Sequence, residues 1–123
     1  MNKPIKVLVV EDEGVVAMNV KMTLLDKGFE VLPIAISADS ALTLTAQYHP
    51  DVVLMDIRIK GNKDGIDAAA LISEHYRIPI IYTTAHQDDL TVQRANSTCH
   101  FGYLVKPYRD EDLFALIDKA VKR

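Results

Sequence analysis

The sequence has almost no cysteine: Cys99 is the one thiol in 123 residues. A single thiol cannot form an internal disulfide, which excludes a small secreted scaffold stapled by disulfides. The same count excludes a structural zinc site built from four cysteines.

Long hydrophobic runs and clusters of positive charge are also missing. No apolar stretch approaches the roughly 20 residues that a membrane span needs. The first residues, Met1 to Pro4, lead into a short apolar run that is followed by acids, which is not a signal peptide. We therefore expect a cytoplasmic protein with no membrane contact. The net charge is −3 without a basic block, so direct binding of nucleic acid is not expected.

The composition is otherwise that of a globular domain. Hydrophobic residues make up 49% of the chain and charged residues 25%, which is enough apolar material for a core. The length predicts one domain over residues 1–123, with no output domain in this chain.

Short apolar runs alternate with longer amphipathic stretches along the whole chain. Strict alternation of this kind predicts an α/β fold, with a doubly wound parallel sheet and helices on both faces. Pro33 places the second strand at a sheet edge, and Gly28 ends the first helix. The expected strands are 5–10, 29–36, 51–55, 79–83 and 101–105, and the expected helices are 13–27, 39–48, 66–76, 88–97 and 109–122.

Polar residues follow four of the five strands. They are Glu11 and Asp12, then Asp56, then Thr84, and finally Lys106. Ligands of open parallel sheets bind at the carboxyl ends of the strands, so these groups should meet at one edge. Three clustered carboxylates repel one another, and a hard cation such as Mg²⁺ relieves that repulsion. A carboxylate can also accept a phosphoryl group as a nucleophile, with a hydroxyl and an ammonium to contact it.

Each of these residues has a structural interpretation when it is taken alone. Glu11 and Asp12 can cap the helix that follows, and Asp56 can be a turn residue. Thr84 can be a strand or cap residue, and Lys106 can be a solvated charge before a proline. The joint pattern, with every group at a strand end, favours the site.

Five short motifs carry a resemblance to a known family. They are Val9-Val10-Glu11-Asp12-Glu13, Leu54-Met55-Asp56-Ile57, Asp64-Gly65, Thr83-Thr84-Ala85 and Tyr103-Leu104-Val105-Lys106-Pro107. In this order the chain resembles the receiver domain of two-component response regulators, from Lys6 to about Val121. The resemblance implies a flavodoxin-like (βα)5 three-layer sandwich with strand order 2-1-3-4-5.

The resemblance also implies roles for particular residues. Asp56 would be the phosphoacceptor, and Thr84 and Lys106 would contact the phosphoryl group. Glu11, Asp12, Asp56 and the backbone carbonyl of Arg58 would hold Mg²⁺ or Mn²⁺. Tyr103 would switch with Thr84 and change the surface formed by the fourth helix, the fifth strand and the fifth helix.

The implied partners follow from the same chemistry. The phosphoryl donor would be a histidine kinase or a histidine phosphotransfer protein, and a downstream protein would read the switched state. The domain would be a signalling switch that catalyses only its own phosphorylation and dephosphorylation. Whether it forms a homodimer stays open.

Some features depart from the family's common pattern. The loop from Ile59 to Asp64 is longer than usual and reshapes one rim of the pocket. Arg58 and His86 each lie two residues beyond a site residue, and our hypothesis is that they tune dephosphorylation. The alternative is that both point to solvent.

The first helix carries more apolar residues than one buried face requires. Val16, Val20 and Leu24 make one stripe, and a second stripe is offset from it: Val15, Met18, Met22 and Leu25. The second stripe is either a docking surface for the kinase or a contact with a neighbouring loop or a second copy.

Two other classes of function compete with the receiver. A phosphatase with an aspartyl-phosphate intermediate would have a second aspartate two residues beyond the nucleophile, where this chain has Arg58. A flavodoxin-like nucleotide-binding module would have a Gly/Ser/Thr-rich loop in place of Glu11-Asp12.

Overall fold

A computed structural model describes residues 3–57, 59, 65–84 and 102–122. Five parallel strands form one sheet in the order β2-β1-β3-β4-β5. The alternation of the sequence predicted the parallel sheet, and the family resemblance implied this order. The strands are β1 (Lys6–Val10), β2 (Glu30–Val31), β3 (Val52–Asp56), β4 (Ile80–Thr84) and β5 (Gly102–Val105). The helices of the described residues are α1 (Gly14–Lys27), α2 (Ala38–Tyr48), α3 (Gly65–Tyr76) and α5 (Asp110–Lys122). The helix expected over 88–97 lies outside the described residues.

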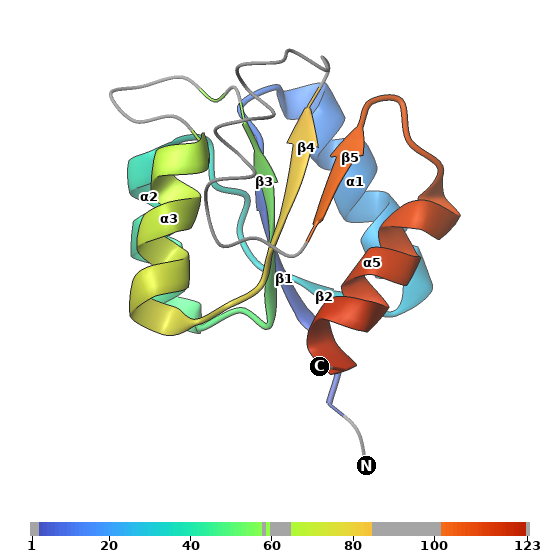
Figure 1. Cartoon of the computed structure of the whole chain (residues 1–123). Coiled ribbons are helices and arrows are strands. Elements are labelled where there is room, and N and C mark those ends of the chain that lie inside the picture. The colour runs from blue at the N-terminus through green and yellow to red at the C-terminus, as the bar shows by residue number, and fades with distance from the viewer. Residues whose placement is uncertain (1–2, 58, 60–64, 85–101, 123) are drawn as a thin grey trace.

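Among the described helices, α2 and α3 cover one face of the sheet, and α1 and α5 cover the other (Figure 1). Successive side chains of a strand point to opposite faces of the sheet, so the core consists of two clusters, one on each face. Leu8 and Val10 of β1 face α2 and α3, whereas Val7 and Val9 join the cluster that contains residues of α1 and α5. Every residue of β3 and β4 is buried, which is what a parallel sheet covered on both faces requires.

The second strand is shorter than predicted. The sequence suggested a strand over 29–36, but β2 has only two residues and is followed by a single bridge from Ala35 to Val10. The amides of Leu32 and Ala35 still donate to carbonyls of β1. Glu30 and Leu32, two residues apart, donate to Ile5 and Val7, but the next donor toward β1 is Ala35, three residues after Leu32. One extra residue therefore interrupts the regular ladder. The nitrogen of Pro33 faces away from β1, where an edge strand has no partner. The strand does lie at a sheet edge, as Pro33 indicated.

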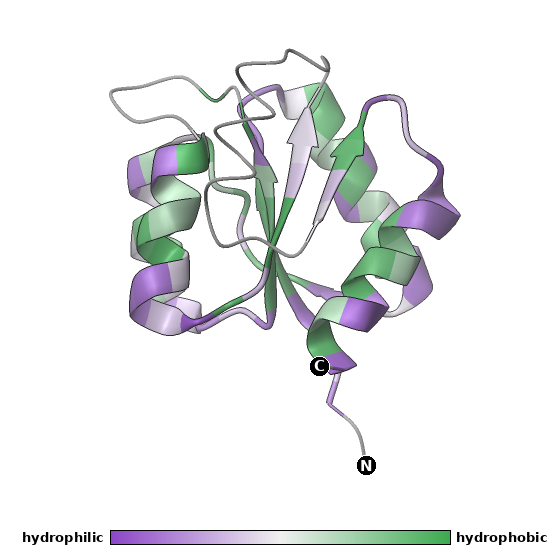
Figure 2. Cartoon of the chain, viewed as in Figure 1, coloured by the Kyte–Doolittle hydropathy of each residue, from purple (hydrophilic) through white to green (hydrophobic). Residues whose placement is uncertain are grey.

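Local signals fix the ends of several helices. Gly28 ends α1 with φ of 99°, and the next amide, that of Phe29, donates to the Leu24 carbonyl, which is a common helix stop. Ser37 caps α2 reciprocally with Ser40. In α5 the acids gather in the first turn and the lysines in the last, in agreement with the helix dipole, while its hydrophobic residues form a separate stripe (Figure 2). None of the described helices is long and apolar enough to cross a membrane.

Candidate functional site

Three acidic side chains meet at the carboxyl edge of the sheet. Glu11 and Asp12 directly follow β1, and Asp56 is the last residue of β3, its neighbour in the sheet. Carboxylate oxygens of the three residues lie within 4.8 Å of one another. Glu11 is 4% exposed and Asp56 is 8% exposed, whereas Asp12 is half-buried. The sequence prediction that strand order would gather these acids is confirmed.

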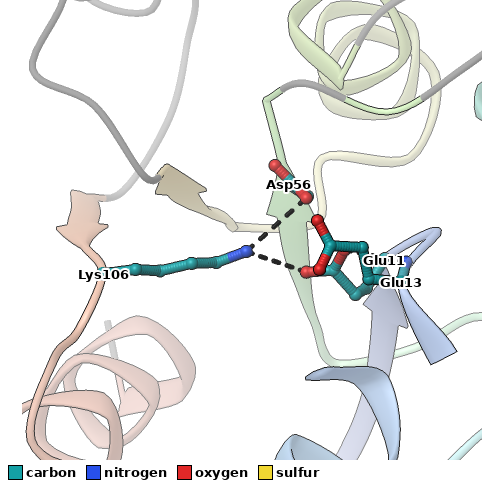
Figure 3. Close-up of polar contacts among 4 residues, drawn as sticks. All are labelled: Glu11, Glu13, Asp56 and Lys106. Carbon is teal, nitrogen blue, oxygen red and sulfur yellow. Dashed lines mark hydrogen bonds and ion pairs between the residues drawn. The ribbon is translucent and has the colours of Figure 1, made fainter. Parts of the chain in front are cut away.

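Lys106 reaches into this acidic cluster from the end of β5. Its Nζ lies 2.8 Å from Oε1 of Glu11 and 3.6 Å from Oδ2 of Asp56 (Figure 3). The shorter contact is a charge-assisted hydrogen bond, in which the ammonium donates to the carboxylate. One cation therefore contacts two of the three acids.

The pKa values of the paired groups move apart. Burial raises the pKa of Glu11, but hydrogen bonds from the Lys106 ammonium and the Glu13 amide outweigh burial, and the pKa falls below its usual 4.5. Burial lowers the pKa of Lys106, but its contacts with Glu11 and Asp56 outweigh that effect, and the pKa rises above 10.5. Both directions describe one ion pair that is fully charged at neutral pH.

Thr84 lies at the same edge, at the end of β4. Thr84 is 1% exposed, and its backbone carbonyl accepts a hydrogen bond of 2.7 Å from the Lys106 amide. The backbone thus ties the threonine to the lysine. Tyr103 lies on β5 opposite Tyr82, is partly buried, and packs against the core cluster beneath α2 and α3. Arg58 and His86 lie outside the described residues.

The sequence analysis did not anticipate two contributors to the geometry. The amide of Glu13 donates to Oε2 of Glu11 at 3.1 Å, while Lys106 donates to Oε1, so both oxygens of the carboxylate are held. Gly65, the first residue of α3, lies against the backbone of Asp56. The Asp64-Gly65 motif pointed to Gly65, but nothing in the motif indicated this close approach.

The fold and the site together define a doubly wound α/β domain with an acidic pocket and a lysine at the carboxyl ends of its strands. Residues 7–118 match the family model of the response regulator receiver domain. The chain belongs to this family.

Proteins of known identity agree with this assignment. The chain is 36% identical over 120 residues to the transcriptional regulatory protein PdtaR of Mycobacterium tuberculosis, covering 98% of this chain and 58% of PdtaR. It is 41% identical over 118 residues to the positive alginate biosynthesis regulatory protein of Pseudomonas aeruginosa, covering 93% and 46%. The chain therefore spans about half the length of these curated relatives.

Solved structures show the same fold. The signal receiver domain of a modulated diguanylate cyclase from Desulfovibrio desulfuricans has a TM-score of 0.92 and 33% identity, and the match covers 98% of this chain and 95% of that one. The Vibrio cholerae chemotaxis protein CheY4 has a TM-score of 0.86 and 26% identity, with 96% and 99% covered.

Proposed function

We propose that this domain is a phosphoacceptor, and that Asp56 accepts a phosphoryl group from a histidine kinase or a histidine phosphotransfer protein. A carboxylate oxygen of Asp56 would form a bond to phosphorus while the bond from phosphorus to the donor's imidazole nitrogen breaks. The nitrogen keeps the electron pair, and Asp56 becomes an acyl phosphate. The observation that carries this proposal is the position of Asp56 at the end of a central strand, among two further acids and one lysine.

The three acids fit a small hard cation. Clustered carboxylate oxygens are donors that suit Mg²⁺, an ion that usually keeps several waters and shares phosphate oxygens. Glu11, Asp12 and Asp56 would hold Mg²⁺ or Mn²⁺, together with the backbone carbonyl of Arg58, which lies outside the described residues. When bound, the ion supplies positive charge to the phosphoryl oxygens.

The lysine and the threonine would contact the new phosphoryl group. Phosphorylation adds nearly two negative charges and three strong acceptors. Lys106 would shift toward these acceptors, and the Thr84 hydroxyl would donate to one of them. Because the backbones of Thr84 and Lys106 are hydrogen-bonded, a movement of either is passed to β5. Tyr103 on β5 would then turn inward, which is a population shift between two states of this surface.

The phosphoryl donor would dock on α1. The stripe of Val15, Met18, Met22 and Leu25 is exposed on the described structure, with Met18 at 53% and Met22 at 56%. A groove of about 310 Å³ on the same helix is lined by Val16, Val20 and the Pro107-Tyr108 turn, and it reaches Lys106. A phosphoryl donor that covers the stripe and this groove would extend to Lys106, next to the acidic pocket.

A Met18→Glu, Met22→Glu protein should lose transfer from the kinase yet keep its reaction with acetyl phosphate. Unchanged transfer would contradict docking and leave a loop or a second copy as the occupant of the stripe.

The test of the phosphoacceptor is the mass of the intact protein after incubation with acetyl phosphate. We expect a gain of one phosphoryl group that requires Mg²⁺ and is absent in Asp56→Asn. The substitution is nearly isosteric, so it removes the nucleophile while retaining the shape of the site. No gain at any Mg²⁺ concentration, and none from a histidine-phosphorylated donor, would contradict the proposal.

The lifetime of the acyl phosphate tests the proposed roles of Arg58 and His86. We propose that both side chains tune the rate of dephosphorylation. Arg58→Ala and His86→Ala should each change the rate at which the phosphoryl group is lost, and an unchanged lifetime in both would contradict the hypothesis.

We place this switch in the cytoplasm, with no catalysis beyond its own phosphorylation and dephosphorylation.

A further inference from the structure

Gly65 makes the closest approach of any described glycine to a neighbouring backbone. A Cβ atom added at Gly65 would lie 2.1 Å from the carbonyl oxygen of Asp56 and 2.9 Å from Cα of Ile57. These are backbone atoms of the acceptor and its neighbour, so no side chain can rotate away to make room. The Gly65 amide also donates to the Ile57 carbonyl at 3.0 Å, which ties the start of α3 to the end of β3.

The backbone of the acceptor is held on its other side as well. Asp56 pairs with Thr83 in the sheet, and the Ile57 amide donates to the Thr83 carbonyl at 3.0 Å. The peptide that follows Asp56 is therefore confined between β4 and the first residue of α3. An added methyl group must push the start of α3 away from the Asp56 peptide by more than 1 Å to reach ordinary van der Waals contact.

Gly14 offers a matched comparison within the same chain. It is the first residue of α1 and follows the acids of β1, just as Gly65 is the first residue of α3 and follows the acid of β3. A Cβ atom at Gly14 would meet nothing within 4 Å. Neither glycine has a positive φ, so alanine can adopt the backbone conformation at both. The two glycines therefore differ in the free space around the Cα atom, which is present at Gly14 and absent at Gly65.

We propose that Gly65 is a positioning residue for the phosphoacceptor. The absence of a side chain lets α3 begin directly against the Asp56 peptide, and this fixes the carboxylate relative to Glu11, Asp12 and Lys106. A displacement of about 1 Å can lower the rate of a well-oriented reaction by about 100-fold. This inference rests on the proposed function of Asp56.

The test compares Gly65→Ala with Gly14→Ala and with Ile66→Val. Ile66 is buried in the first turn of α3, so Ile66→Val weakens the packing of the same helix and adds no atom against the Asp56 peptide. For each protein we would measure the unfolding free energy in urea, the Mg²⁺ affinity by calorimetry, and the rate of mass gain against acetyl phosphate concentration. If Gly65→Ala is partly unfolded in buffer, all proteins are measured in trimethylamine N-oxide, which favours the folded state.

We expect the folded fraction of Gly65→Ala to react at least 10-fold more slowly and to bind Mg²⁺ more weakly, while Gly14→Ala and Ile66→Val keep wild-type values. A folded Gly65→Ala protein that reacts at the wild-type rate would overturn the inference. So would an equal loss in Ile66→Val, because the effect would then follow stability. A wild-type protein that gains no phosphoryl group would instead count against the proposed function itself.

Discussion

Replacing Lys106 with methionine should tighten the binding of Mg²⁺, although the lysine belongs to the proposed site. The ammonium donates to Glu11 over 2.8 Å and lies 3.6 Å from Asp56, and both acids are proposed ligands of the ion. A cation that enters the pocket has to compete with Lys106 for the Glu11 carboxylate. Methionine retains an unbranched side chain and removes the competing charge.

The size of the effect follows from the contact that is lost. A hydrogen bond to a charged group contributes about 1.5–3 kcal/mol net. The Lys106 side chain is 25% exposed, so the lower end of that range applies, and about 1.4 kcal/mol corresponds to a tenfold change in affinity. We therefore expect Lys106→Met to bind Mg²⁺ about 10-fold more tightly.

Isothermal titration calorimetry with Mg²⁺ measures this directly, and Mn²⁺ titration followed by electron paramagnetic resonance provides a second readout. Lys122→Met is the control, because it removes the same charge from an exposed pair with Asp118 at the end of α5. Equal tightening in both variants would mean that only net charge matters. Unchanged or weaker binding in Lys106→Met would refute the competition between lysine and ion.

Three further predictions concern stability. The lowered pKa of Glu11 contributes stability that is present above pH 4.5 and is lost as the pH falls through the pKa of the folded state. The raised pKa of Lys106 contributes stability that is present below pH 10.5 and is lost as the pH rises through the pKa of the folded state. Lys106→Met should therefore flatten both the acidic and the basic arm of a plot of urea midpoint against pH. Thr45→Val should raise the free energy of unfolding by about 1 kcal/mol, because the buried Thr45 hydroxyl has no hydrogen-bond partner among the described residues; a lower urea midpoint would contradict this. Gly28→Ala should cost about 1–2 kcal/mol in the same assay, because φ is 99° at that position, and an unchanged midpoint would count against the strain.

Much of the fold could be predicted from the sequence because its signals are local. Apolar runs identified the strands, Gly28 marked the end of α1, and strict alternation predicted the parallel sheet. The acids could be placed together because each follows a strand directly, and parallel strands bring their carboxyl ends to one edge.

Features that depend on how elements pack could not be predicted in this way. Pro33 pointed to an edge strand, yet one extra residue between the Leu32 and Ala35 donors broke the regular ladder and shortened that strand to two residues. The preference of Lys106 for Glu11 over Asp56 depends on how the end of β5 meets the end of β1. The approach of Gly65 to Asp56 depends on the seating of α3 on the sheet. Neither the Lys106–Glu11 distance nor the Gly65–Asp56 distance can be read from the spacing of residues along the chain.

The long sequence separation of the Lys106–Glu11 pair has a consequence for synthesis on the ribosome. The two residues lie 95 positions apart, and all three acids precede the lysine in the chain. Chains are made from the N-terminus, so β1 and β3 can emerge and pair before β5 exists. A nascent domain at that stage has its carboxylates without their lysine. Divalent cations in solution can neutralise this charge until Lys106 is made.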